Sequence, residues 1–212
     1  MKKQGILTVI SGFSGAGKGT VVKRLLEMHP DEYCLSISAT TRKPRDIEQD
    51  GVHYFFKSKE AFEQMIASDD LLEYAQYVDN YYGTPKSFVI DHLNQGVHVI
   101  LEIEMQGALK VKKRFPEALL IFITPPTAKE LEERLVGRGT ETEEVIKQRL
   151  LRAREEAVYM NDYDYIVLNE TGNADACVAS IHRIICDQQD RVENCGDFIQ
   201  KMADDLKNHV SQ

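Results

Sequence analysis

Residues 5–20 read GILTVISGFSGAGKGT, an apolar run that ends in a glycine-rich turn. The turn has the spacing G-x4-G-K, which between a strand and a helix is typical of a loop that binds nucleotide phosphates. Both neighbours fit, because ILTVI (6–10) predicts a strand and VVKRLLEM (21–28) has helical apolar spacing. Glycines let backbone N–H groups turn toward a phosphate, and a lysine can reach its β and γ oxygens. We therefore predict that ATP contacts Gly12, Phe13, Ser14, Gly15, Ala16, Gly17, Lys18, Gly19 and Thr20.

The residue after the motif lysine departs from the general pattern. Gly19 stands where a serine or threonine usually ligates magnesium, and the hydroxyl follows one residue later, at Thr20. Magnesium keeps several of its waters in most protein sites. We therefore expect no direct protein ligand, and Mg²⁺ held through water, with Thr20 and Glu102 as candidate partners.

Outward from the loop, short apolar runs alternate with helical patterns. The runs ILTVI, VHVILEI (97–103), ALLIFIT (118–124) and DYIVL (164–168) are each followed by a helical pattern, which predicts an α/β fold with a parallel sheet. Residues 36–87 interrupt the alternation and predict an inserted lobe of short strands around a helix near 59–67. Residues 127–159, interrupted by Gly137 and Gly139, predict a helical lid. The core then comprises 1–35, 88–126 and 160–190, and 191–212 predicts an amphipathic helical tail packed on it.

Composition narrows the functional classes. The 212 residues include 42% hydrophobic residues, enough for a sizeable core, and carry a net charge of -8, which disfavours a nucleic-acid partner. No apolar run approaches the length of a transmembrane helix, and no signal peptide is recognisable, so we expect a cytoplasmic protein without a membrane partner. The four cysteines form no CxxC pair and the six histidines have no metal-binding spacing, so we expect reduced thiols and no metal bound by either. The oligomeric state is left open.

Further motifs follow in the lobe and beyond it. They are TTRKPR (40–45), GVHYFF (51–56), LEYA (72–75), NYYGT (80–84), LEIEMQG (101–107) and VGRGTETEE (136–144). With the phosphate-binding loop, and in this order to about Asn169, they make the chain resemble the guanylate kinase family. The resemblance implies a P-loop core with an inserted GMP-binding lobe and a helical lid. It also implies transfer of the γ-phosphoryl group of ATP to GMP and dGMP with Mg²⁺, a step in GMP recycling and guanine nucleotide biosynthesis.

The residue chemistry of the lobe agrees with this resemblance. Arg42 and Arg45, stiffened by Pro44, can grip a dianionic phosphate with bidentate hydrogen bonds. A carboxylate such as Glu73 can accept from both donors of the guanine edge, whereas adenine would leave it unpaired. By resemblance the GMP contacts are Ser38, Arg42, Arg45, Tyr54, Glu73, Tyr82 and Thr84. Glu102 and Glu104, at a strand end where α/β sheets bind ligands, could hold either GMP or the magnesium waters.

The lid supplies positive charge for the transfer. Arg134 and Arg138 are one helical turn apart and share a face, and Arg149 lies in the next helical pattern. By resemblance these three converge with Lys18 and Arg42 on the phosphates and act in catalysis, and Asn169 lies near the adenine of ATP. Two alternatives stay open: a guanylate-kinase-like scaffold domain that binds phosphopeptides, and a kinase for another small phosphorylated acceptor.

Overall fold

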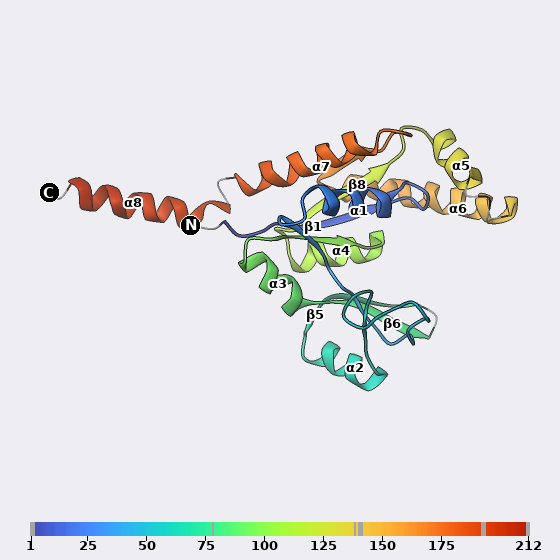
Figure 1. Ribbon diagram of the computed structural model, residues 1–212, viewed down its shortest axis with the longest axis horizontal. Helices are drawn as coiled ribbons and strands as arrows, with labels where there is room; N and C mark the ends of the chain where they lie inside the picture. Colours follow the sequence, from blue (N-terminus) through green and yellow to red (C-terminus); the bar gives the residue numbers. More distant parts are fainter. Residues whose placement is uncertain (1–2, 78, 138, 140–141, 192–193, 211–212) are drawn as a thin grey trace.

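The computed structural model describes residues 3–77, 79–137, 139, 142–191 and 194–210. Arg138, a predicted catalytic arginine, lies outside these residues. Figure 1 shows a core of helices around a sheet, a smaller lobe on one side of it, and a helix that extends away at the C-terminal end.

The core sheet is parallel, as predicted. Its strands are, in spatial order, β2 (Tyr33–Leu35), β7 (His98–Glu102), β1 (Leu7–Gly12), β8 (Leu119–Thr124) and β9 (Tyr165–Leu168). All four neighbouring pairs are parallel. Because the carboxyl ends of parallel strands share one edge, Gly12 and Glu102 end adjacent strands on the same side of the molecule. We did not predict β2, because three residues are too short to show an alternating pattern.

Helices cover both faces of this sheet. One apolar cluster joins it to α1 (Lys18–Met28) and α7 (Ala174–Gln189). A second cluster, on the opposite face, includes residues of α3 (Lys86–Asn94) and α4 (Met105–Arg114). A third packs the phosphate-binding loop through Phe13 and Ala16 against α5 (Ala128–Gly137) and α6 (Glu143–Glu156). The 3-10 helix η1 (Ala157–Asp162) leads from α6 toward β9.

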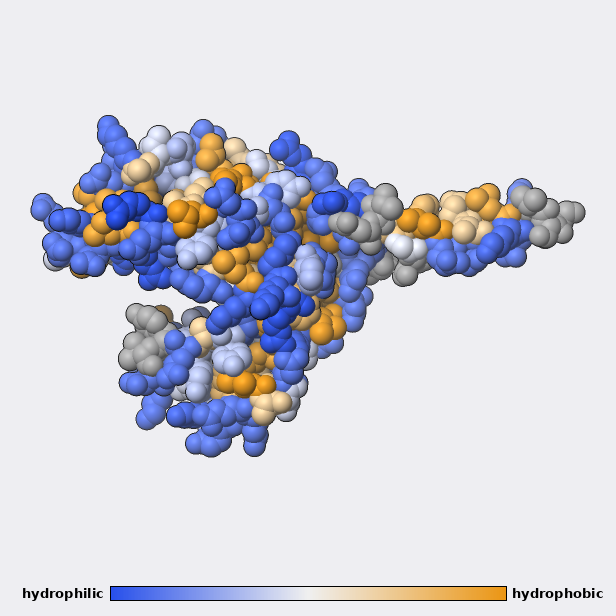
Figure 2. Space-filling view, turned by 180° about the vertical axis from the view of Figure 1, so that it is seen from behind, coloured by the Kyte–Doolittle hydropathy of each residue, from blue (hydrophilic) through white to orange (hydrophobic). Residues whose placement is uncertain are grey.

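The lobe has a sheet of its own. Its strands are, in spatial order, β4 (Phe55–Phe56), β3 (Ala39–Thr40), β6 (Asn80–Pro85) and β5 (Leu71–Tyr77). Helix α2 (Lys59–Ala67) begins after Ser58, whose hydroxyl accepts the Ala61 N–H, and it buries Phe62 against this sheet. Figure 2 shows the surface hollowed between the core and the lobe.

Helix α8 (Gly196–Val210) is where the structure departs most from expectation. It extends away from the core, and Phe198 and Leu206 are 59% and 55% exposed. Its apolar residues form a stripe along one side in Figure 2. The prediction that it packs on the core was wrong, because amphipathic spacing defines an apolar face but not a partner. Within the described part of the chain, no helix combines the length and apolarity that crossing a membrane requires.

Candidate nucleotide-binding site

The phosphate-binding loop joins β1 to α1 and depends on glycine at three positions. Gly15 and Gly17 have φ angles of 94° and 87°, in the left-handed region that favours glycine. A Cβ on Gly12 would lie 2.1 Å from the Ile123 carbonyl oxygen on β8, so no side chain fits there. The Lys18 ammonium donates to the Gly12 carbonyl oxygen at 2.7 Å and thus lies across the loop. The predicted phosphate ligands therefore form one turn at the N-terminus of α1.

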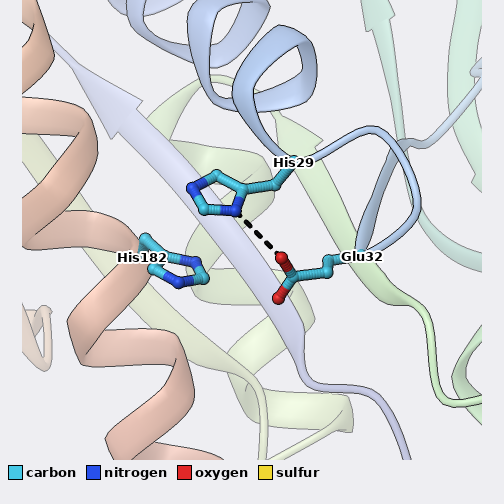
Figure 3. Close-up of side chains that lie close together, drawn as sticks. All are labelled: His29, Glu32 and His182. Carbon is cyan, nitrogen blue, oxygen red and sulfur yellow. Dashed lines mark hydrogen bonds and ion pairs between the residues drawn. The ribbon is translucent and has the colours of Figure 1, made fainter.

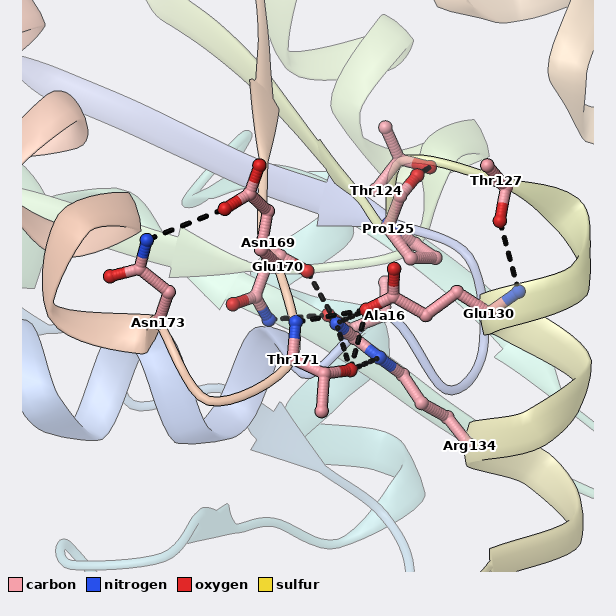
Figure 4. Close-up of polar contacts among 10 residues, drawn as sticks. All are labelled: Ala16, Thr124, Pro125, Thr127, Glu130, Arg134, Asn169, Glu170, Thr171 and Asn173. Carbon is pink, nitrogen blue, oxygen red and sulfur yellow. Dashed lines mark hydrogen bonds and ion pairs between the residues drawn. The ribbon is translucent and has the colours of Figure 1, made fainter.

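Asn169 and Arg134 hold the loop at the carbonyl oxygen of Ala16 (Figure 4). The buried Asn169 amide donates to the Ala16 carbonyl oxygen at 2.8 Å, and Arg134 Nη1 donates to the same oxygen at 3.1 Å. Arg134 also donates to the Asn169 carbonyl oxygen. In this conformation, both side chains act on the backbone of the phosphate-binding loop.

Two residues that the sequence reasoning missed complete this network. Glu130 accepts from Arg134 Nη2 at 2.6 Å and from the Thr171 backbone N–H at 2.9 Å. Hydrogen bonds from Thr171 and Arg134 lower the pKa of Glu130. The spacing of Glu130 and Arg134, four residues apart on one helix, was a signal that could have found the pair. Thr171 gave no such signal, because it reaches the network only through the fold.

Two pockets border the phosphate-binding loop, and a third adjoins the second of them. The largest, about 680 Å³, is lined by Gly15, Gly17, Thr20, Arg134 and Asn169 together with residues 170–175. A second, about 270 Å³, is lined by loop residues including Lys18, Gly19 and Thr20, and by Glu102 and Glu104. A third, about 140 Å³, lies toward the lobe and is lined by Leu35, Ser36, Ser38, His53, Tyr54, Thr84, Leu101, Glu102 and Ile103. Glu102 lines the second and the third pocket, so the pockets form a series from the core to the lobe.

Glu102 is the acidic group at the centre of this series. Burial raises its pKa, Lys18 opposes that shift, and Glu104 adds to it. A Cβ on Gly19 would lie 3.6 Å from Glu102 Oε1, so the glycine after the motif lysine brings the backbone close to this carboxylate. Oxygen donors from Thr20, Glu102 and Glu104 therefore border one pocket beside Lys18.

Glu73 on β5 is a buried carboxylate next to the pocket on the lobe side. The residue is 8% exposed, and its Oε1 accepts a hydrogen bond from the Thr84 hydroxyl at 2.9 Å. Burial raises the pKa of Glu73, and the hydrogen bond from Thr84 and the charge of Lys110 oppose this shift. A Cβ on Gly107 of α4 would lie 3.4 Å from Glu73 Oε2, so this glycine leaves room for the carboxylate.

Arg42 has a partner that the sequence reasoning did not anticipate. Its Nη1 and Nη2 donate to the two carboxylate oxygens of Glu48 at 2.9 and 2.8 Å, and the Arg45 backbone N–H also donates to Glu48 at 2.8 Å. These contacts raise the pKa of Arg42 and lower that of Glu48 to about 2. The Arg42 guanidinium lies 5.4 Å from the centre of the Tyr54 ring, which in turn lies 6.2 Å from that of Tyr82. The structure therefore groups Arg42, Tyr54 and Tyr82, and leaves the Arg45 side chain exposed.

Arg149 reaches the loop from α6. Its Nη1 donates to the Ser14 hydroxyl. Arg134 and Arg149 thus contact the phosphate-binding loop from two different helices, at Ala16 and at Ser14. The loop has arginines on two sides, which is an arrangement suited to a polyphosphate.

A parallel sheet, a glycine-rich loop at a helix N-terminus and arginines around it define a P-loop phosphotransferase. The guanylate kinase family model matches residues 4–188. The guanylate kinase of Caldanaerobacter subterraneus subsp. tengcongensis is 51% identical over 205 residues, covering 97% of this chain and 98% of that protein. That of Streptococcus thermophilus is 48% identical over 207 residues, covering 98% of each. The crystal structure of guanylate kinase from Anaplasma phagocytophilum aligns with a TM-score of 0.66 at 29% identity, covering 90% of this chain and 89% of that one. The chain belongs to the guanylate kinase family.

Proposed function

We propose that this protein transfers the γ-phosphoryl group of ATP to GMP, and also to dGMP, with Mg²⁺ as cofactor, and so serves guanine nucleotide biosynthesis and GMP recycling. The observation that carries the proposal is Glu73, a buried carboxylate hydrogen-bonded to Thr84 beside the pocket on the lobe side. A buried carboxylate is costly unless donors satisfy it. The guanine edge offers two such donors, N1–H and the 2-amino group.

Recognition of the base then follows from the residues around this carboxylate. Glu73 accepts from the guanine edge, and Ser38 and Thr84, which line the same pocket, are assigned to O6. The Thr84 hydroxyl has one proton, which it donates to Glu73 in this structure, so it must turn from Glu73 to donate to O6. Adenine has an acceptor at N1 and lacks the 2-amino group, so it would leave a buried charge without donors. None of these assigned contacts reaches the 2′-hydroxyl of the sugar, which is the reason to include dGMP.

The acceptor phosphate is assigned to Arg42, Arg45, Tyr54 and Tyr82. When GMP binds, the Arg42 guanidinium must then either leave the Glu48 carboxylate for the phosphate oxygens or divide its N–H donors between the two. The bidentate geometry on Glu48 supports this role, because a guanidinium presents the same pair of donors to a carboxylate and to a phosphate.

The donor nucleotide is assigned to the phosphate-binding loop and the largest pocket. The loop N–H groups and Lys18 bind the β and γ phosphates, and Asn169 and the residues after it border the pocket assigned to adenosine. Arg134 and Arg149, which contact the loop, stabilise the charge on the transferred group. Arg138 is assigned to the same role from its sequence position alone.

The residues beside the loop fit magnesium. Thr20, Glu102 and Glu104 offer the hard oxygen donors that this ion prefers, directly or through water. When bound, the ion neutralises charge on the β and γ phosphates. Glu102, which lines both the second pocket beside Lys18 and the pocket on the lobe side, is assigned to orient the acceptor toward the loop.

A substrate panel tests the proposal. ADP release from ATP and Mg²⁺ is measured with GMP, dGMP, AMP, CMP and UMP, each at several concentrations. We expect turnover with GMP and dGMP, and at least about 100-fold lower kcat/KM with the other three, because none of them presents the two adjacent donors, a ring N–H and the 2-amino group, that Glu73 accepts from guanine. An inert GMP, with ATP binding or phosphopeptide binding intact, contradicts the proposal. Preference for another nucleotide would assign the protein to a different acceptor.

A further inference from the structure

A cluster of histidines lies at the other end of helix α1 from the phosphate-binding loop. His29 directly follows α1 as its C-terminal cap, Glu32 lies in the turn before β2, and His182 lies on α7. Figure 3 shows the three side chains converging between α1 and α7. At 1.5 Å per residue, α1 places this cluster about 16 Å from the loop. None of its members lines the three nucleotide pockets.

The donor atoms are close enough to share one ion. One ligand atom from each of the three residues lies within 4.8 Å of the others. His29 Nδ1 and Glu32 Oε1 are 2.9 Å apart, and the rings of His29 and His182 stack with centroids 3.9 Å apart. Binding an ion replaces the His29–Glu32 hydrogen bond, and the His29 ring must turn out of the stack. Both side chains have room to move, because the Glu32 side chain is 49% exposed and the His29 side chain is 20% exposed.

Cys186 is the nearest further donor; its Sγ is not among the ligand atoms that lie within 4.8 Å of one another, so the thiol must turn toward the ion to bind it. Cys186 follows His182 by one helical turn, and its Sγ lies 3.7 Å from His182 Nε2. The ligands therefore come as two local pairs, H-x2-E at the end of α1 and H-x3-C on α7, and such short spacings are common in zinc sites.

A partner outside the ligand set orients His182. The hydroxyl of the buried Tyr33 lies 2.7 Å from His182 Nδ1. With Nδ1–H donating to Tyr33, Nε2 carries the lone pair that a metal ion needs; Cys186 Sγ lies 3.9 Å from Nδ1 and 3.7 Å from Nε2. Histidine ligands in proteins almost always have such a second hydrogen bond, which sets the tautomer and the ring orientation.

We propose that His29, Glu32, His182 and Cys186 bind a zinc-like transition metal ion that ties α1 to α7. Two imidazoles and a thiolate favour Zn²⁺, Co²⁺ or Ni²⁺ over Mg²⁺, which prefers oxygen. Because α1 carries the phosphate-binding loop at its N-terminus, the ion stabilises the part of the core on which the loop is built. This revises the expectation that neither the histidines nor the cysteines bind metal. The sequence hid the site because its two halves lie about 150 residues apart and meet only through the packing of α1 on α7.

Titration with the metal alone tests the site. Full-length, tag-free protein is treated with chelator, dialysed, and titrated with Zn²⁺ and separately with Co²⁺ in the absence of Mg²⁺ and nucleotide. We expect one equivalent to bind, and the melting temperature to rise by about 5–10 °C at a metal concentration a hundredfold above Kd. The Co²⁺ complex should show a tetrahedral visible spectrum with a sulfur charge-transfer band.

The variants separate this site from other places where metal could bind. His182→Gln should weaken Zn²⁺ binding at least about tenfold, and Tyr33→Phe, which preserves the core, should weaken it by a similar factor. Cys186→Ser should remove the charge-transfer band. His209→Gln and Cys195→Ser, outside the cluster, serve as matched controls and should bind as wild type. Equal binding by wild type and His182→Gln places the ion elsewhere and overturns the proposal, as does the absence of saturable binding in wild type.

Discussion

Replacing Glu73 by glutamine tests the base-recognition assignment with a change of one atom. A hydrogen bond to a charged group contributes about 1.5–3 kcal/mol, and the glutamine amide would turn a donor toward one of the two guanine donors. Losing one such bond and setting two donors against each other should cost at least about 3 kcal/mol, or about 100-fold in kcat/KM for GMP. The measurement is ADP release with GMP and with IMP, which lacks the 2-amino group. The wild type should prefer GMP, and Glu73→Gln should lose most of that preference.

Stability separates a loss of recognition from a loss of folding. Because burial raises the pKa of Glu73, the wild type, free of nucleotide, should lose unfolding free energy as pH rises from the ordinary glutamate value through the raised one. Glu73→Gln lacks this ionisation, so its melting temperature should equal or exceed that of wild type at neutral pH. Glu63→Gln, an exposed change on α2 of the same lobe, is the matched control for activity. A kcat/KM for GMP within threefold of wild type, or an unchanged GMP-to-IMP ratio, would refute the assignment.

Three further substitutions test the loop and its surroundings. Gly12→Ala places a Cβ 2.1 Å from the Ile123 carbonyl oxygen, so β1 and β8 must separate, and urea denaturation should show a loss of about 3 kcal/mol. Arg134→Lys keeps the charge but loses the planar set of donors around Ala16, and KM for ATP should rise roughly tenfold. Glu48→Gln removes a carboxylate whose pKa is lowered to about 2 from 4.5. The stability that ionised Glu48 gives the wild type above pH 4.5, and that the wild type loses as the pH falls from 4.5 toward 2, should therefore be absent.

Each of these changes has its own control. Gly196→Ala meets no atom within 4 Å and should leave the urea midpoint near that of wild type, so an equal effect of both alanines would count against the strand-separation argument. For Arg134→Lys, the KM for GMP should stay within twofold, and a selective rise in that value would place the residue on the acceptor side. For Glu48→Gln, melting curves at pH 4.5 and below decide, because stability lost as the pH falls toward 2 should be smaller than in wild type. An unchanged difference between the two proteins across this range refutes the linkage.

The parallel sheet and the phosphate-binding loop could be predicted because their signals are local. The glycine spacing of residues 12–17, the strand before it and the helix after it lie within one short segment, and the helix α2 was predicted with the observed bounds Lys59–Ala67. Partners brought together by the fold could not be predicted in the same way. Arg42 has many carboxylates within its reach in sequence, and only the turn geometry selects Glu48.

Helix α8 shows the complementary limit. Its apolar spacing correctly indicated a helix with two faces, and nothing in that spacing could tell a packed helix from one that extends into solvent. The division into core, lobe, lid and tail and the roles of the individual site residues stay predictions. The experiments above on Glu73 and Arg134 address those roles directly.

Strand β5 has a consequence for how the specificity of such an enzyme can change. Neighbouring residues of β5 contact different parts of the molecule. Leu72 is buried in the core cluster with α4, and the next residue, Glu73, is the carboxylate assigned to the guanine base, which accepts from Thr84 of the lobe. Lys110 of α4 also donates to the Tyr74 carbonyl oxygen at 2.9 Å. The lobe therefore cannot be exchanged for that of another protein as an independent unit, because β5 of the new lobe would have to pack against α4 of this core. We therefore expect the base specificity of the acceptor site to change more easily through single substitutions on β5 and β6 than through exchange of whole segments.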